Sequence, residues 1–152
     1  EQAAAEYALE LSERGWSVQV ATDIPSLLQV TNLVVTTTPS TAPLLLGAQV
    51  QPGTHITAMG SDTEHKRELD TALLIRADRV VADSRSQCAV RGEIARATSE
   101  GFDASTIVEL GEVIAGKAAG RSSEEQITVV DLTGVAVQDL AIAEAVAGRL
   151  GS

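Results

Sequence analysis

One stretch of the sequence, residues 55–70, combines the end of an apolar segment with side chains that can exchange protons. The apolar segment breaks at Gly60, Asp62 follows it closely, and Lys66 lies four positions further on. A carboxylate in such a place can act as a general acid or base. Lys66 could keep Asp62 ionised or contact a phosphate group. In the alternative interpretation, Asp62 is an ordinary turn or capping acid and Lys66 is a solvated surface charge.

Two further apolar segments also end in polar residues. Residues 33–38 run from leucine and valine into three threonines followed by Pro39, and residues 131–134 read Asp-Leu-Thr-Gly. In open α/β sheets, ligands bind just beyond the carboxyl ends of parallel strands. We therefore expect Thr38 and Pro39 to line a nucleotide crevice, offering hydroxyls and exposed backbone amides. Alternatively, the threonines are ordinary β-branched strand residues, and residues 131–134 are simply a strand-to-helix turn.

Several other chemically interesting residues favour no site. His55 and His65 lack further ligands at metal-binding spacing, so we expect no metal centre. Cys88 lies in a helical pattern and is interpreted as a packing residue rather than a nucleophile. The sequence contains neither a G-x-G-x-x-G motif nor a P-loop, so it has no glycine-rich loop for binding phosphate.

Composition limits the class of protein. The chain has 152 residues, of which 44% are hydrophobic and 2% aromatic, which fits one tightly packed α/β domain. A net charge of −10 argues against nucleic-acid binding, which depends on basic residues. No apolar run approaches the roughly 20 residues that span a bilayer, and the start shows no secretion pattern. With one cysteine there is no internal disulfide. We expect a cytoplasmic protein that binds neither nucleic acid nor membrane.

Hydrophobic periodicity predicts strands that alternate with helices. Such alternation predicts an α/β fold with a mostly parallel sheet of about five strands, right-handed crossovers and flanking helices. The expected strands are 16–20, 33–38, 55–59, 79–83 and 127–131. The expected helices are 1–14 ending at Gly15, a short one capped by Asp23, one capped by Asp70, one from Ser84 to about Ala97, one containing Ile107, Leu110 and Ile114 and ending at Gly116, and a closing helix containing Leu140 and Ala147. Residues 44–50 form a short helix or a turn, and residues 117–126 form a loop.

Five motifs, taken together and in order, resemble the ornithine cyclodeaminase/mu-crystallin family. They cover nearly the whole chain. The motifs are residues 34–40, residues 52–62, Lys66 with residues 68–69, residues 109–113 and residues 131–139.

The resemblance implies a function and a set of roles. Members of that family are NAD(P)-dependent, typically homodimeric, and act on small amino or imino acids as deaminating cyclases, dehydrogenases or imine reductases. By motif, Asp62 matches the catalytic acid or base. The implied cofactor-binding residues are Thr38, Pro39, Met59, Gly60, Lys66, Thr133 and Gly134, and Leu132 and Thr133 would face the substrate.

The resemblance also implies that parts of the enzyme lie outside this sequence. We expect residues 1–152 to be an incomplete, Rossmann-type NAD(P)-binding domain without the glycine-rich phosphate turn and without the N-terminal substrate and dimerisation domain. The strand at 16–20 would then have to repack beside the strand at 33–38, pair with another copy, or associate with the missing half. The rival hypothesis is a noncatalytic truncated or ligand-binding homologue. The sequence does not choose between NAD and NADP.

Overall fold

The computed structural model describes residues 2–150, with side chains through residue 149. The chain divides into two compact units, and the boundary in the sequence lies between Thr31 and Asn32. The first unit contains α1 (Gln2–Glu13) and α2 (Ile24–Val30). Gly15 has a φ of +87° just after α1, as expected of a helix stop. The Asp23 carboxylate accepts a hydrogen bond from the Ser26 amide (2.8 Å), which confirms the predicted cap of α2.

The predicted strand at residues 16–20 is wrong. These residues have no regular secondary structure, and the sheet does not include them. Alternating side chains favour a strand, but a strand forms only where another backbone supplies hydrogen bonds. No such partner pairs with residues 16–20 in the described chain, so the expected repacking beside the strand at Leu33 is not observed either.

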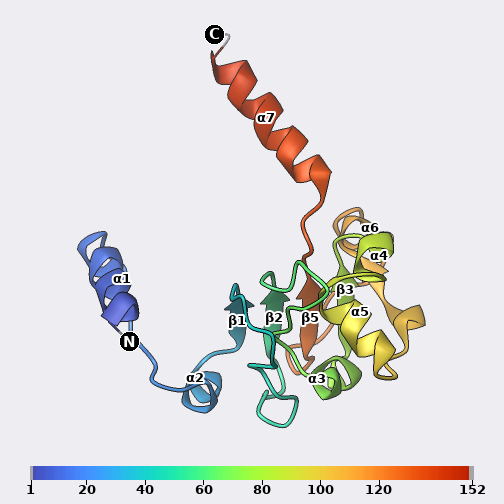
Figure 1. Cartoon of the computed structure of the whole chain (residues 1–152), viewed down its shortest axis with the longest axis horizontal. Helices are drawn as coiled ribbons and strands as arrows, with labels where there is room; N and C mark the ends of the chain where they lie inside the picture. Colours follow the sequence, from blue (N-terminus) through green and yellow to red (C-terminus); the bar gives the residue numbers. More distant parts are fainter. Residues whose placement is uncertain (1, 151–152) are drawn as a thin grey trace. The chain divides into compact units, whose positions relative to one another are not determined.

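The second unit is built on a five-stranded sheet in which every pair is parallel (Figure 1). Its strands are β1 (Leu33–Thr36), β2 (His55–Ala58), β3 (Arg79–Ala82), β4 (Val108–Glu109) and β5 (Thr128–Asp131). Their order across the sheet is β1-β2-β5-β3-β4. The predicted parallel α/β fold is therefore confirmed. β5 follows the other strands in the sequence, yet it lies at the centre of the sheet.

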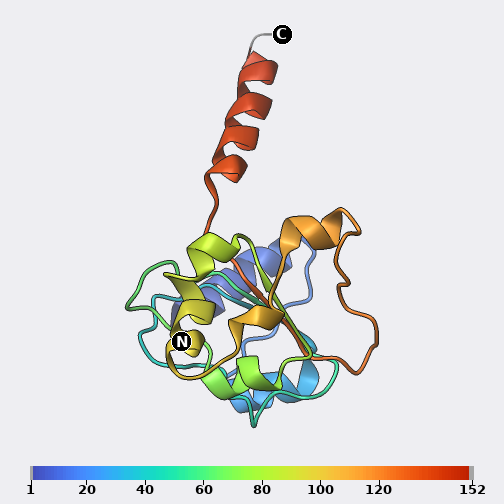
Figure 2. The same ribbon diagram turned by 90° about the vertical axis from the view of Figure 1, so that its right-hand side faces the viewer.

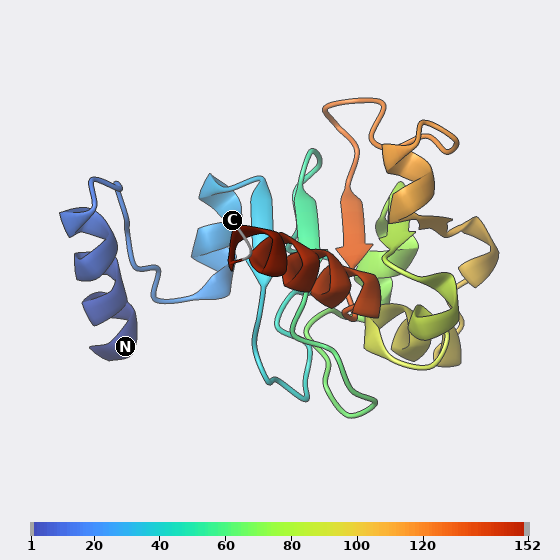
Figure 3. The ribbon, with the colours of Figure 1, turned by 90° about the horizontal axis from the view of Figure 1, so that it is seen from above.

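Helices cover both faces of this sheet. They are α3 (Thr71–Arg76), α4 (Arg85–Cys88), α5 (Gly92–Ser99) and α6 (Leu110–Ile114), with a short 3-10 helix (Ala104–Thr106) before β4. Figures 2 and 3 show α5 and α6 on opposite sides of the strands. The α5 face of the sheet presents Ile56, Val80 and Val129, which are buried together with Leu73 and Ile94 of α3 and α5. This apolar layer holds the strand ends in place.

The last helix, α7 (Ala136–Leu150), matches the predicted closing helix. Its side chains from Ala136 to Arg149 are all exposed. No helix in the described part of the chain is both long and apolar enough to cross a membrane.

Two helix predictions need correction. The helix expected from Ser84 to Ala97 is split into α4 and α5, because Gly92 has a φ of +88°, which an uninterrupted helix does not allow. Ser84 also makes no side-chain capping bond. In place of the single helix expected around Ile107, the chain forms the 3-10 helix, the short strand β4 and then α6. Gly116 has a φ of +68° just after α6, as expected of a helix stop. Residues 44–50 form turns rather than a helix.

Candidate functional site

Three loops that contain the predicted site residues meet at the carboxyl ends of adjacent strands. We call loops 37–40, 59–62 and 132–134, which follow β1, β2 and β5, the strand-end site. The Met59 amide donates to the Thr36 carbonyl (2.9 Å), and the Leu132 amide donates to the Ala58 carbonyl (2.9 Å). These bonds extend the parallel ladders one residue beyond the strands. The juxtaposition of these loops follows directly from the order β1-β2-β5.

The backbone amides of the first two loops point inward to a buried acid. Glu68, which is fully buried, accepts hydrogen bonds from the Thr38 amide at Oε1 (2.5 Å) and from the Gly60 amide at Oε2 (2.9 Å). The expected exposed amide of Thr38 is therefore not available to a nucleotide, because Glu68 already accepts its hydrogen bond. The Thr38 hydroxyl in turn accepts a bond from the Ser40 amide (3.2 Å).

Gly60 lies where no side chain fits. A Cβ built on Gly60 would lie 2.5 Å from the Glu68 carboxyl carbon and would also overlap the Thr38 carbonyl oxygen. The glycine therefore lets the backbone approach the carboxylate closely. Met59, immediately before it, is 48% exposed, so its side chain is open to a ligand at the strand-end site.

Asp62 and Lys66 form an ion pair, as their spacing allowed. The Lys66 ammonium lies 2.7 Å from Asp62 Oδ1, although the segment between them is a turn and not a helix. The hydrogen bond from Lys66 is the main cause that holds the pKa of Asp62 below its ordinary value. Asp62 is therefore ionised at neutral pH, which is the form that a general base requires, and its carboxylate is half-exposed.

The third loop is held by an acid that sequence reasoning missed. Asp83, just after β3, accepts hydrogen bonds from the amides of Thr133 (2.7 Å) and Gly134 (2.9 Å) and from the Thr133 hydroxyl (3.1 Å). Gln87 donates to the Thr133 hydroxyl (3.1 Å) and to the Gly134 carbonyl (2.9 Å). The polar groups of Thr133 are thus already used by protein partners. Asp83 follows an apolar strand just as Asp131 does, and that shared signal could have identified it.

Asp131 lies behind this loop as a buried acid. Its Oδ2 accepts a hydrogen bond from the Ile94 amide (2.9 Å), whereas its Oδ1 has no partner in the described chain. Burial, reinforced by the carboxyls of Glu93 and Asp83, raises the pKa of Asp131 to about 7. Asp131 therefore contributes no exposed group to the strand-end site.

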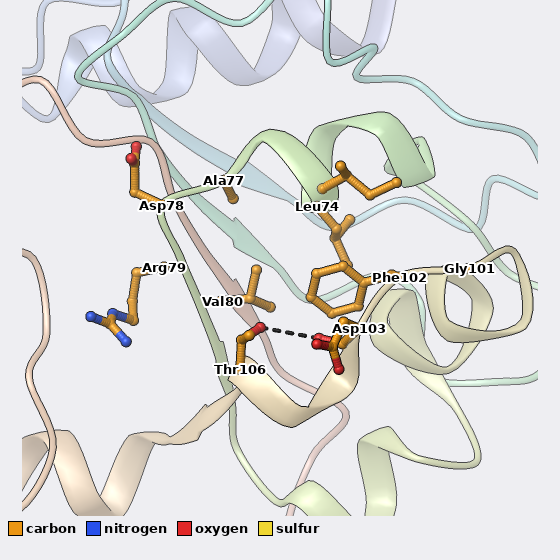
Figure 4. A pocket seen from close by; sticks show the side chains of 10 residues that line it. Leu74, Ala77, Asp78, Arg79, Val80, Gly101, Phe102, Asp103 and Thr106 are labelled. Atoms are coloured by element: carbon orange, nitrogen blue, oxygen red, sulfur yellow. Dashed lines mark hydrogen bonds between the residues drawn. The ribbon is translucent and has the colours of Figure 1, made fainter.

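Two larger cavities lie elsewhere in the second unit. One of about 420 Å³ opens at the amino end of β3 and contains none of the predicted site residues (Figure 4). Its lining includes Asp78, Val80, Phe102 and Asp103. The other, of about 350 Å³, lies on the α6 side of the sheet, and Leu132 lines it together with apolar residues of β3, β5 and α6. Leu132 therefore faces away from Thr133, and the structure does not bring the two predicted substrate residues together in one cavity.

A smaller cavity adjoins Lys66. It has a volume of about 200 Å³ and is lined by Thr41, Glu64, His65, Lys66, Arg67 and Arg96. Its walls are polar, and Arg67 and Arg96 are both paired with Glu100. Among the described residues, no cluster of His, Cys, Asp or Glu has the arrangement of a metal site.

Comparison with known proteins assigns the chain to the family that the motifs at these strand ends and the acid-lysine pair resemble. The family model of ornithine cyclodeaminase/mu-crystallin matches residues 1–152. The chain belongs to this family. The ornithine cyclodeaminase/mu-crystallin chain is 44% identical over 117 residues to an alanine dehydrogenase of Archaeoglobus fulgidus, covering 76% of this chain and 36% of that protein. It is 42% identical over 127 residues to an iminosuccinate reductase of Paracoccus denitrificans, and the match covers 83% of this chain and 39% of the reductase.

Solved structures of family members have the same fold. An archaeal alanine dehydrogenase dimer with bound NAD matches with a TM-score of 0.87 and 39% identity, over 94% of this chain and 44% of that one. The Paracoccus denitrificans iminosuccinate reductase in complex with NAD+ matches with a TM-score of 0.83 and 40% identity. This match covers 93% of this chain and 42% of the reductase chain. The fold is therefore Rossmann-type, as expected, and the chain spans about two fifths of the length of these relatives.

Proposed function

We propose that this chain is part of an NAD(P)-dependent oxidoreductase or deaminating cyclase that acts on a small amino or imino acid. The observation behind the proposal is the ionised Asp62, paired with Lys66 beside the carboxyl ends of β1 and β2. Relatives named as an alanine dehydrogenase and an iminosuccinate reductase, each with a structure containing NAD, support the reaction class. We propose that residues 1–152 are an incomplete cofactor-binding domain and that the protein is a homo-oligomer.

The residues of the strand-end site fit the nicotinamide end of a dinucleotide better than its phosphates. The Met59 side chain is 48% exposed and therefore open for apolar contact. In contrast, the amides of Thr38, Gly60, Thr133 and Gly134 all donate to carboxylates, and buried acids lie behind them. Such a surface does not suit a phosphate anion. We therefore propose that Thr38, Pro39, Met59, Gly60, Thr133 and Gly134 surround the nicotinamide.

In this proposal the protein moves one proton. Bound nicotinamide accepts or donates a hydride. Asp62 takes a proton from the substrate amine or returns one to it, as a general base or acid. The hydrogen bond from Lys66 keeps the Asp62 carboxylate ionised until the carboxylate takes up the proton from the substrate. The carbonyl of Gly60 accepts a hydrogen bond from the Asp62 amide (3.1 Å), which fixes the acid relative to the end of β2.

The test is a substitution in the full-length enzyme. Asp62→Asn keeps the shape of the side chain but cannot take up a proton at neutral pH, so we expect turnover to fall by about a hundredfold or more, the low end of general acid-base contributions. The dissociation constant for NAD(P) should change less than threefold. Glu64→Gln, two residues away on the same turn and exposed, is the matched control. Near-normal turnover of the Asp62→Asn enzyme would refute the proposal.

A further inference from the structure

The carboxylate of Glu68 joins two loops that come from different strands. Its two oxygens accept hydrogen bonds from the amides of Thr38 and Gly60, at 2.5 and 2.9 Å. Thr38 lies two residues beyond β1, and Gly60 lies two residues beyond β2. β1 and β2 are adjacent in the sheet, but their ladder ends at Thr36 and Ala58. Beyond that point, Glu68 is the group that sets the separation of the two loops.

Glu68 is itself fixed by two other segments of the chain, α5 and residues 44–45. Its amide donates to Oε1 of Glu93 on α5 (2.7 Å), and its carbonyl accepts from the amides of Leu44 (2.7 Å) and Leu45 (3.0 Å). The other oxygen of Glu93 accepts from the Leu69 amide (3.1 Å). With no exposed surface, Glu68 has no room to adopt another position.

The bridge requires a carboxylate of this length. A carboxylate has two acceptor oxygens, whereas an amide side chain presents one oxygen and one NH₂ group. Glutamine at position 68 would therefore place a donor against one of the two backbone amides. The glycine at position 60 completes the fit, because any Cβ there would collide with the Glu68 carboxyl group.

We propose that Glu68 is a positioning residue of the active site, which fixes the Thr38–Pro39 loop and the Gly60–Asp62 loop at one separation before the cofactor binds. The inference rests on the proposed function for its catalytic meaning. Glu68 is fully buried and acts through Gly60, whose carbonyl accepts a hydrogen bond from the amide of Asp62. The position of the acid relative to the end of β1 therefore depends on Glu68.

The test uses Glu68→Gln in the full-length enzyme with Asp78→Asn as the matched control. Asp78 likewise accepts a backbone hydrogen bond, from the Ile127 amide (2.8 Å), but at the amino end of the sheet. We expect Glu68→Gln to lower kcat by about tenfold or more while the KM for the amino or imino acid changes less than threefold, because a misplaced acid slows the chemical step. Asp78→Asn should leave both constants unchanged.

A second readout is independent of activity. Amide hydrogen exchange of Thr38 and Gly60, resolved by NMR, should accelerate at least tenfold in Glu68→Gln and stay unchanged in Asp78→Asn. Should Glu68→Gln fail to fold, Glu93→Gln is the substitute, because it weakens the hydrogen bonds to the backbone of residues 68–69 and leaves the Glu68 carboxylate in place. We expect Glu93→Gln to lower kcat and to accelerate amide exchange at Thr38 and Gly60, each by a smaller factor than Glu68→Gln.

The outcomes separate the two hypotheses. Wild-type kcat together with wild-type exchange at Thr38 and Gly60 would overturn the positioning role. Faster exchange with unchanged kcat would also overturn it and leave Glu68 as a structural residue only. If the wild-type enzyme reduces no NAD(P)+ with any amino acid, oxidises no NAD(P)H with any imino acid and releases no ammonia from any diamino acid in the presence of NAD(P)+, the proposed function fails, and the catalytic role of Glu68 fails with it. Asp62→Asn with normal turnover would refute the role of Asp62 and, with it, the route through Gly60 by which Glu68 is proposed to act, whatever the kcat of Glu68→Gln.

Discussion

The carboxylate of Asp83 accepts a hydrogen bond of 2.7 Å from the backbone amide of Thr133, 50 positions further along the chain. The Thr133 hydroxyl donates to the same carboxylate at 3.1 Å. Asp83 thus connects the residue after β3 with the loop after β5 through hydrogen bonds. Glu68 connects the loops after β1 and β2 in the same way. All three loops of the strand-end site are therefore shaped by side chains that lie behind them.

Replacing Asp83 should loosen the third loop. Asp83→Ala leaves the amides of Thr133 and Gly134 without their acceptor, which should cost about 1–3 kcal/mol of unfolding free energy. Urea denaturation measures the loss. The exposed capping acid Asp103, whose side chain accepts a hydrogen bond from the Ser105 amide (2.9 Å), gives a matched control as Asp103→Ala. Equal destabilisation by both variants would contradict the special role of Asp83.

Asp131 should make stability depend on pH. Burial raises its pKa from the ordinary 3.8 to about 7, so the folded chain binds the proton more tightly than the unfolded chain does. The folded state must therefore lose stability as the pH rises from about 4 to about 7. At about 1.4 kcal/mol for each pKa unit, the loss is at most roughly 4 kcal/mol.

Asp131→Asn isolates this contribution, because the neighbouring side chains Glu93, Asp83 and Cys88 are present in both proteins. Asparagine can still accept the hydrogen bond from the Ile94 amide. We expect the variant to gain stability relative to the wild type as the pH rises through that range, measured by urea denaturation at several pH values. Parallel stability curves for the two proteins would show that Asp131 titrates normally.

Cys88 should resist thiol reagents. It is fully buried, and burial, together with the charges of Asp131 and Asp83, raises the pKa of the Cys88 thiol to about 12. Because only the thiolate reacts, labelling of the native protein at pH 8 should be at least about a thousandfold slower than labelling of the urea-unfolded chain. Native labelling at the unfolded rate would contradict both its burial and its interpretation as a packing residue.

Removing Lys66 should raise the pKa of Asp62. The hydrogen bond from Lys66 is the largest cause of the lowered pKa, so Lys66→Gln should move it towards the ordinary value for aspartate. An NMR titration of the carboxyl carbon measures the change. Lys117→Gln, at the lysine that follows α6, is the control and should leave the Asp62 titration as it is in the wild type.

Gly92 should not tolerate a side chain. Its φ is +88°, and a Cβ there would lie 2.6 Å from Asp131 Oδ2 and 2.7 Å from Thr133 Cγ2. Gly92→Ala should therefore cost roughly 2–4 kcal/mol, from strained backbone and overpacking together. Gly111→Ala is the control, because Gly111 lies in α6 with open space around it and should be neutral or slightly stabilised. Thermal unfolding of the two variants tests the contrast.

The strand ends could be predicted from local pattern, whereas the groups that hold them could not. Apolar segments at 33–38, 55–59 and 127–131 predict strands, which the structure has at 33–36, 55–58 and 128–131, and the polar residues at their ends predict the loops. The Asp62–Lys66 pair also needed only short-range spacing. Glu68 and Asp83, by contrast, act on amides 30 and 50 positions away, and no local pattern shows which backbone groups a buried acid will meet.

Other differences have the same cause. The alternation at residues 16–20 resembles a strand, but a strand depends on a partner that the local sequence does not show. β4 has two residues, Val108 and Glu109, which is too short to leave any periodicity. The break between α4 and α5 follows from the close approach of Gly92 to Asp131, a contact between residues far apart in the sequence.

The position of β5 has a consequence for how the protein is made. β5 hydrogen-bonds to β2 on one side and to β3 on the other, and these two strands do not pair with each other. During synthesis on the ribosome, β1 with β2 and β3 with β4 can form early, but each pair exposes an inner edge until residues 128–131 emerge. Such open edges attract other chains. The sheet of this unit therefore closes only when β5 has formed, and a chaperone that shields strand edges would act in that interval.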